Sequence, residues 1–243
     1  MNHLMRYMPI AHLIQQERVG EEKILEVGSG PKGVKVYFPD AAVVAVDVTF
    51  DRNPGSASSD FSLVRATAES LPFRDGAFPF VVCVDVLEHI RAESRQEVIR
   101  ELLRVASKKV YLAFPGRESY EAWEKKLSKL YVLCGKDVPE WMREHMENGL
   151  PEEKEVAKLL GSAGNIQQTI PNENNVVHFA IMLVDEFIWP GNRLGEVIAP
   201  RRWRFTEHRL TDNLFRVLFF GFRYVPRVAN FGSTVRKLYI LER

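Results

Sequence analysis

The most constraining feature of the sequence is a glycine-rich turn between two short apolar runs. The first run ends at Val27, the turn contains Gly28, Gly30 and Gly33, and the second run ends at Asp47. Glycine lets the backbone bend sharply and approach a ligand with no Cβ in the way. A carboxylate at the end of the next strand can accept hydrogen bonds from both hydroxyls of a ribose. This order predicts a sheet that binds a nucleoside-containing cofactor.

Two cofactor classes fit this turn. The glycine spacing matches the dinucleotide fingerprint, which allows an NAD(P)-dependent oxidoreductase. Glu26, two positions before the first glycine, would repel a pyrophosphate and attract an ammonium group. S-adenosylmethionine carries an amino group and a sulfonium but no phosphate. The turn therefore favours S-adenosylmethionine, and the oxidoreductase and a purely structural glycine turn are the alternatives.

Apolar runs alternate with helical patterns along the chain, which is typical of a parallel α/β sheet. Strands are predicted over 23–27 and 43–47, and two more continuous apolar runs predict strands covered on both faces. Ser94 and Glu97 form a predicted capping box at the start of a helix. The remaining predictions are strands over 80–85 and 109–114, a helix over 94–106 between them, a helix over 152–160, a strand over 166–170, helices over 176–190 and 207–221, and a closing strand over 235–241 near the sheet edge.

Length and composition predict one domain with a full apolar core, since 46% of the 243 residues are hydrophobic. We expect a single domain over 1–243, with a helical insertion or lid over 117–150 above the carboxyl ends of the strands. A helical elaboration is expected over 172–230. The cysteines, Cys83 and Cys134, and the six histidines show no metal-ligand spacing, so no metal is expected. Two cysteines and no membrane-length apolar stretch favour a cytoplasmic location.

Charge is unevenly distributed along the chain. Residues 201–243 contain ten Lys or Arg against three Asp or Glu, a net charge of +7 that leaves about −6 for the rest. Aromatic residues interleave with the basic ones, which leaves an anionic, lipid-linked or nucleic-acid acceptor open beside ordinary surface charge. No sequence-specific nucleic-acid motif appears. A non-catalytic protein that binds RNA or anionic lipid through this segment is a further alternative, and the oligomeric state is not indicated.

Four motifs together resemble the class I S-adenosylmethionine-dependent methyltransferases, in the broad group that includes the ubiquinone and menaquinone methyltransferases. These motifs are residues 26–30, 46–47, 66–73 and 84–89, and the resemblance covers about residues 20–115. The resemblance implies a Rossmann-like, doubly wound, mostly parallel α/β fold. It also implies S-adenosyl-L-methionine as the cofactor.

The resemblance implies roles for residues of the first two motifs. Glu26 and the backbone of Gly28, Ser29 and Gly30 would hold the methionine part of the cofactor. Asp47 would bind the ribose hydroxyls.

The later motifs would complete the cofactor site. Val48 would contact the adenine, and the turn of Thr67, Ala68 and Glu69 would bind its edge through a backbone N–H and a side-chain acceptor. Family members usually have Asp where Thr67 stands, so this turn would offer a hydroxyl in place of a carboxylate. Asp85, at the end of a buried strand, would contact the cofactor or the substrate.

His89 and His145 are the candidate catalytic bases, because histidine titrates near neutral pH. Each has a structural alternative: His89 could hold the following loop, and His145 could help to end a helix. Glu88 is expected at the surface or at a helix cap. Methyl transfer to an already nucleophilic atom needs no base, because alignment supplies much of the acceleration. We therefore expect methyl transfer to a small-molecule or glycan acceptor, with oxygen as the preferred atom.

Overall fold

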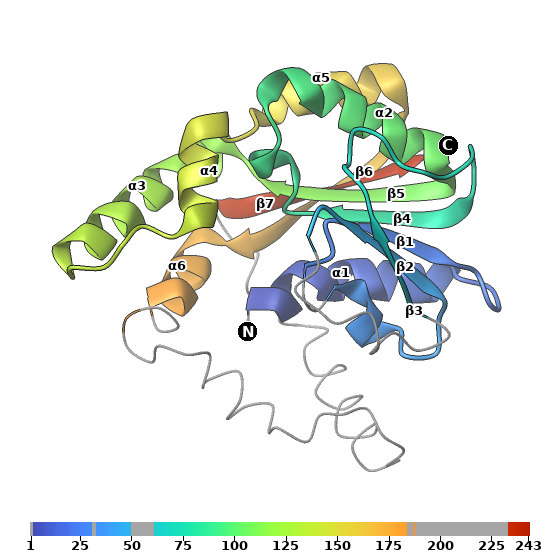
Figure 1. Ribbon diagram of the computed structural model, residues 1–243, viewed down its shortest axis with the longest axis horizontal. Coiled ribbons are helices and arrows are strands. Elements are labelled where there is room, and N and C mark those ends of the chain that lie inside the picture. The colour runs from blue at the N-terminus through green and yellow to red at the C-terminus, as the bar shows by residue number, and fades with distance from the viewer. Residues whose placement is uncertain (1, 31–32, 50–60, 184–186, 188–232) are drawn as a thin grey trace, which may run out of the picture.

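The computed structural model describes residues 2–30, 33–49, 61–183, 187 and 233–243. Its centre is a seven-stranded sheet (Figure 1). The strands are β1 (Ile24–Val27), β2 (Val43–Asp47), β3 (Phe61–Arg65), β4 (Phe78–Val84), β5 (Ala106–Pro115), β6 (Asn165–Asn174) and β7 (Thr234–Glu242). The helices are α1 (Asn2–Glu17), α2 (Arg95–Val105), α3 (Arg117–Leu133), α4 (Glu140–Asn148), α5 (Glu153–Ala163) and α6 (Asn175–Leu183).

The sheet has the strand order β3-β2-β1-β4-β5-β7-β6. Strands β1 to β5 run parallel, and β7 inserts antiparallel between β5 and the edge strand β6. The predicted Rossmann-like, doubly wound and mostly parallel α/β fold is confirmed. Because Val27 of β1 pairs with both Val46 of β2 and Cys83 of β4, the turns after these three strands lie side by side at the carboxyl edge of the sheet.

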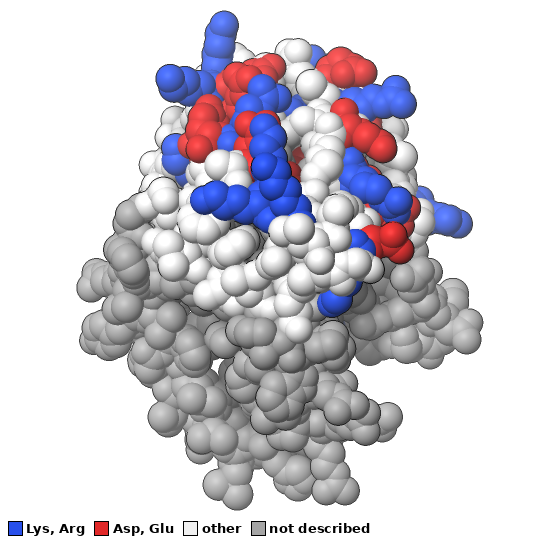
Figure 2. All heavy atoms as spheres, turned by 90° about the vertical axis from the view of Figure 1, so that its left-hand side faces the viewer, with Lys and Arg blue, Asp and Glu red and all other residues white. Residues whose placement is uncertain are grey.

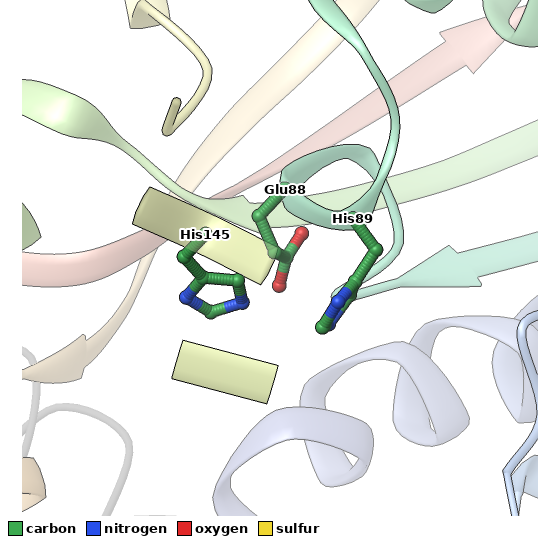
Figure 3. A group of neighbouring side chains, drawn as sticks. All are labelled: Glu88, His89 and His145. Atoms are coloured by element: carbon green, nitrogen blue, oxygen red, sulfur yellow. The ribbon is translucent and has the colours of Figure 1, made fainter. Parts of the chain in front are cut away.

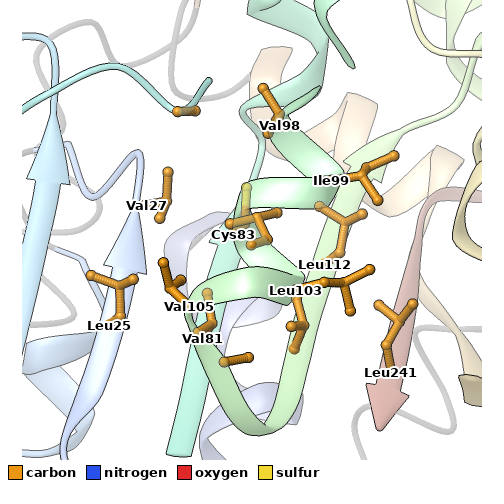
Figure 4. Packing of buried hydrophobic residues seen from close by; sticks show 14 of the residues in the cluster. Leu25, Val27, Val81, Cys83, Val98, Ile99, Leu103, Val105, Leu112 and Leu241 are labelled. Carbon is orange, nitrogen blue, oxygen red and sulfur yellow. The ribbon is translucent and has the colours of Figure 1, made fainter. Parts of the chain in front are cut away.

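Alternating side chains give the sheet two apolar faces. Leu25 and Val81 pack on one face in the cluster that α2 and α5 cover, part of which Figure 4 shows. Ile24 and Phe80, their neighbours along the strands, point to the other face and pack against Ile10 and other apolar residues of α1. All five of these side chains are fully buried.

Several elements differ from the sequence prediction. Helix α1, with Pro9 inside it, and strand β3 at the sheet edge are present although no element was predicted at either place. The predicted insertion over 117–150 contains the two helices α3 and α4. The predicted helix over 207–221 and most of the predicted elaboration over 172–230 lie outside the described residues. None of the described helices is long and apolar enough to cross a membrane.

The predicted capping box at the start of α2 is wrong. Among the described residues, the side chain of Ser94 makes no capping hydrogen bond. The 3-10 turn η4 (Ala92–Ser94) precedes the helix, so the backbone of Ser94 is already helical, with φ −91° and ψ −13°. An N-cap side chain reaches the helix N–H groups from a non-helical backbone. Glu97, the predicted partner, pairs with Arg100 instead.

Candidate functional site

The glycine turn after β1 is open on one side and closed on the other. Gly28 and Gly30 both have positive φ, +74° and +53°, a region in which side chains with a Cβ are strained. A Cβ added to Gly28 would lie 2.2 Å from Cγ2 of Val86, whereas one added to Gly30 would meet no described atom within 4 Å. Ser29, between the two glycines, is buried. The backbone at Gly30 is therefore the part of the turn that a ligand can approach.

Asp47 lies beside this open glycine. Its Oδ2 accepts a hydrogen bond from the N–H of Gly30 at 3.0 Å, and its Oδ1 accepts one from the N–H of Thr49 at 3.2 Å. The next residue, Val48, is 55% exposed, which is unusual for a large apolar side chain in this protein. The structure thus places a carboxylate between an accessible glycine and an accessible apolar side chain.

Glu26 holds the glycine turn through the backbone of Val34, and its contact with a cofactor stays a prediction. The side chain is fully buried, and its Oε2 accepts a hydrogen bond from the N–H of Val34 at 2.7 Å. A Cβ at Gly33 would lie 2.2 Å from the same oxygen, so this position needs glycine. Burial raises the pKa of Glu26 to about 8, although the hydrogen bond from Val34 opposes the shift. A hydrogen bond with the side chain of Tyr7 also opposes the shift.

The turn predicted to bind adenine lies next to Asp47. The N–H of residue 66 donates to the carbonyl of Asp47 at 3.2 Å, which joins this turn to the end of β2. Within the turn, Thr67 is exposed, Ala68 is buried and Glu69 is half-buried. The structure therefore brings the first three sequence motifs together at one edge.

Asp85 directly follows β4 and has a positive φ of +54°, an uncommon conformation for a residue other than glycine. Its carboxylate lies 2.7 Å from a nitrogen of Arg6 in α1 and 2.6 Å from Nε of Arg236 in β7. Burial alone raises the pKa of Asp85, but the charges of Arg236 and Arg6 outweigh it and lower that pKa to about 2. The structure gives this carboxylate two protein partners, and its contact with a ligand stays a prediction.

These charges belong to a larger inner ion cluster, which we define as Arg6, Asp85, Glu173, His178 and Arg236. Arg236 pairs with Glu173 as well as with Asp85, and Nδ1 of His178 lies 3.0 Å from Oε1 of Glu173. Arg236, Glu173 and His178 are almost fully buried. Sequence reasoning missed this cluster, although a charged residue inside the apolar run of β7 was a signal for it.

The two predicted catalytic histidines lie together, although 55 positions separate them along the chain. His89 is in the 3-10 turn η3 (Leu87–His89) after β4, His145 is in α4, and their ring centroids are 4.8 Å apart. Nδ1 of His89 lies 2.5 Å from Oε2 of Glu144, and Nδ1 of His145 lies 2.6 Å from Oε1 of Glu124. With each Nδ1 bonded to a carboxylate, each Nε2 is left with a lone pair that can accept a proton or bind a metal ion.

The backbone of each histidine also makes a hydrogen bond that joins it to the end of α4. The carbonyl of His145 accepts a hydrogen bond from the N–H of Gly149 at the end of α4, and the side chain of Asn148 donates to the carbonyl of His89 at 2.9 Å. Burial, and next the neighbouring His145, lower the pKa of His89. Glu88 is 1% exposed, so its predicted surface position is wrong.

Few basic residues of the C-terminal segment are among the described residues, and those that are have structural partners. Arg236 is in the inner ion cluster, and Lys237 pairs with Glu153. Arg243 donates to two backbone carbonyls at the far end of the sheet. Figure 2, viewed from the side of α3 and α4, shows Lys and Arg interspersed with Asp and Glu rather than gathered by sign.

Comparison with known proteins agrees with this geometry. Residues 25–114 match the family model described as a methyltransferase domain. A curated relative, norajmaline N-methyltransferase of Rauvolfia serpentina, is 28% identical over 141 residues, which cover 51% of this chain and 42% of the relative. The chain therefore spans less than half the length of this curated relative.

Solved structures share the fold at low sequence identity. Phosphoethanolamine N-methyltransferase 2 of Haemonchus contortus, in complex with S-adenosyl-L-methionine, is 13% identical, with 97% of this chain and 52% of that chain covered and a TM-score of 0.55. Magnesium protoporphyrin IX methyltransferase of Synechocystis PCC 6803 is 16% identical, with 68% and 75% covered and a TM-score of 0.51. The [4+2]-cyclase SpnF is 15% identical, with 97% and 81% covered and a TM-score of 0.56. Residues 25–114 thus match a methyltransferase-domain model, and the chain shares the Rossmann-like fold of these solved methyltransferases.

Proposed function

We propose that the protein transfers a methyl group from S-adenosylmethionine to a small-molecule or glycan acceptor. The observation that carries the proposal is the position of Asp47 between the open backbone at Gly30 and the exposed side chain of Val48. A carboxylate there can accept hydrogen bonds from a ribose diol, and an adenine would cover the exposed valine.

The remaining residues of the turn fit a cationic ligand that carries no phosphate. Glu26 holds the turn through Val34, and its side chain also shares a hydrogen bond with Tyr7 of α1. A carboxyl oxygen at this position can accept a hydrogen bond from an ammonium group and, in its charged form, offers no donor that would hold a pyrophosphate. When bound, S-adenosylmethionine supplies an electrophilic methyl group on its sulfonium. Ser29, Thr67 and Glu69 line the same edge and stay predicted contacts.

We place the acceptor on the side of His89 and His145, beyond the end of β4. If the acceptor atom is a hydroxyl oxygen, its proton must leave as the methyl group arrives. Either unprotonated Nε2 can take that proton, because the carboxylates of Glu144 and Glu124 already occupy the Nδ1 atoms. The curated relative and one structural neighbour are named as N-methyltransferases, so nitrogen is the competing acceptor atom.

Calorimetric titration of the full chain with S-adenosylmethionine, S-adenosylhomocysteine and NAD tests the cofactor. We expect both sulfur compounds to bind, and Asp47→Ala to weaken this binding by about 1–3 kcal/mol through lost hydrogen bonds. Asp47→Asn keeps one acceptor oxygen and should lose less. Asp75→Ala is the matched control, because Asp75 is exposed and pairs with Arg104 on another part of the surface.

Binding of NAD alone would instead favour the oxidoreductase. Transfer of a labelled methyl group to a panel of phenols, amines and sugars then tests the reaction itself. Cofactor binding with no transfer, combined with salt-sensitive binding of RNA or anionic vesicles, would favour the non-catalytic alternative.

A further inference from the structure

We propose that Glu88, His89 and His145 bind a divalent transition-metal ion. Each residue offers one ligand atom, and these atoms all lie within 4.8 Å of one another. Figure 3 shows the carboxylate of Glu88 between the two imidazoles. A metal ion at the centre of the group would need only a small contraction, because Zn–N and Zn–O bonds are about 2.0–2.2 Å long. The inference rests on this geometry and does not depend on the proposed methyl transfer.

Carboxylates next to the Nδ1 atoms orient both imidazoles, as the outer partners of histidine ligands do in metal sites. Metal-binding histidines almost always donate their other ring N–H to a carboxylate, a carbonyl or a water. Here Nδ1 of His89 lies 2.5 Å from Glu144, and Nδ1 of His145 lies 2.6 Å from Glu124. Each carboxylate favours the tautomer with the proton on Nδ1 and leaves the Nε2 lone pair available. Two histidines, each with its own glutamate on Nδ1 and both facing the carboxylate of Glu88, are a metal-ligand arrangement.

Two of the three groups have a buried atom that lacks a partner. Oε2 of Glu88 and Nε2 of His145 are buried and have no hydrogen-bond partner among the described residues. Glu88 is 1% exposed and His145 is 5% exposed. Leaving a carboxylate oxygen and an imidazole nitrogen buried and unpaired is unfavourable. One cation between them would satisfy both atoms.

The ligand set indicates the class of metal. Two imidazole nitrogens and one carboxylate oxygen form the His₂Glu set of catalytic zinc sites, and non-haem iron(II) uses a similar set. Such sites keep at least one coordination position open. The side chain of His89 is 33% exposed, so the group can be reached from solvent. In the metal-bound protein the Nε2 atoms would be ligands, and the cation would lower the pKa of an acceptor hydroxyl in place of a histidine base.

The experiment is a titration of the full chain, freed of any affinity tag and of metal by a chelator, with Zn(II) by calorimetry and with Co(II) by visible absorption. We expect one equivalent to bind, with Co(II) d–d bands typical of nitrogen and oxygen ligands. Glu88→Gln and His145→Ala should each abolish this binding. Glu124→Gln changes only the outer partner of His145 and should weaken binding by about 10–100-fold.

Two matched controls isolate the site. His12→Ala removes a histidine of α1 whose ring bonds Gln16, and Cys134→Ser removes the exposed thiol. Both should leave the bound equivalent unchanged. Circular dichroism of each variant shows whether it has folded, and Glu124→Gln, which is nearly isosteric, provides a second variant if His145→Ala does not fold. No binding by the folded wild-type chain, or equal binding by wild type, Glu88→Gln and Glu124→Gln, would overturn the proposal.

Discussion

The buried carboxyl of Glu26 should make the stability of the protein fall as the pH rises. Its pKa is about 8 in the folded chain, against 4.5 for an ordinary glutamate, because burial disfavours the charged form. Between these two values the unfolded chain has released a proton that the folded chain retains. The stabilisation is therefore fully present below about pH 4.5 and is lost as the pH rises through about 8. Linkage gives a loss of about 3–4 kcal/mol between about pH 5 and about pH 8 from this single group.

The variant Glu26→Gln isolates this contribution, because an amide is neutral at every pH and keeps an oxygen that can accept the N–H of Val34. Urea unfolding followed by tryptophan fluorescence, at several pH values and without cofactor, gives the free energy of unfolding of both proteins. We expect similar stabilities near pH 5 and a more stable variant near pH 8. Glu97→Gln, on the surface, should follow the wild-type curve. If the difference between the free energies of unfolding of wild type and Glu26→Gln changed by less than about 1 kcal/mol across this pH range, the reasoning would be refuted.

Three further changes test the packing by denaturant unfolding. Gly33→Ala should destabilise the protein by more than the roughly 1–3 kcal/mol of left-handed strain, because its Cβ meets a carboxylate at 2.2 Å. Gly30 also has a positive φ, but a Cβ there meets no described atom within 4 Å, so equal losses for the two variants would contradict the clash. Arg236→Gln should lower the free energy of unfolding by about 3–5 kcal/mol, because it leaves buried carboxylates unpaired. Lys237→Gln removes a partly exposed ion pair with Glu153 and should lower it by at most about 1 kcal/mol. Ser94→Ala should lower the free energy of unfolding by less than about 0.5 kcal/mol, and a larger loss would show that the Ser94 side chain does cap the helix.

The strands of the sheet were the part of the fold that the sequence predicted best. Continuous apolar runs over 80–85 and 109–114 require cover on both faces, and the structure has β4 and β5 there, between neighbouring strands. Strand β3 was not predicted because it is an edge strand whose residues include Ser62 and the exposed Arg65. Helix α1 was not predicted because Pro9 interrupts its pattern and only one of its faces is apolar.

The candidate site also has one part that the sequence predicts and one part that it does not. Gly30 lies in the turn after β1 and Asp47 ends the adjacent strand β2. The strand order is therefore enough to bring them together, and a short sequence motif can record the pair. The approach of His145 to Glu88 depends on how the insertion packs against η3, and the spacing of apolar residues along the sequence does not predict that packing. The sequence therefore contains no recognisable metal-binding motif at these residues, because 56 residues lie between Glu88 and His145. The burial of Glu88 could not be predicted either, because it depends on the same packing of the insertion against η3.

The inner ion cluster connects the stability of the chain to the geometry of this site. Asp85 has a strained backbone three residues before Glu88, and a strained conformation persists only where its surroundings hold it. Here Arg6 of the first helix and Arg236 of the last strand hold the carboxylate of Asp85 from two sides. We therefore expect a change at either arginine to affect the turn that carries Glu88 and His89 as well as the stability of the chain. The two elements that hold Asp85 are the first helix and the last strand of the described residues.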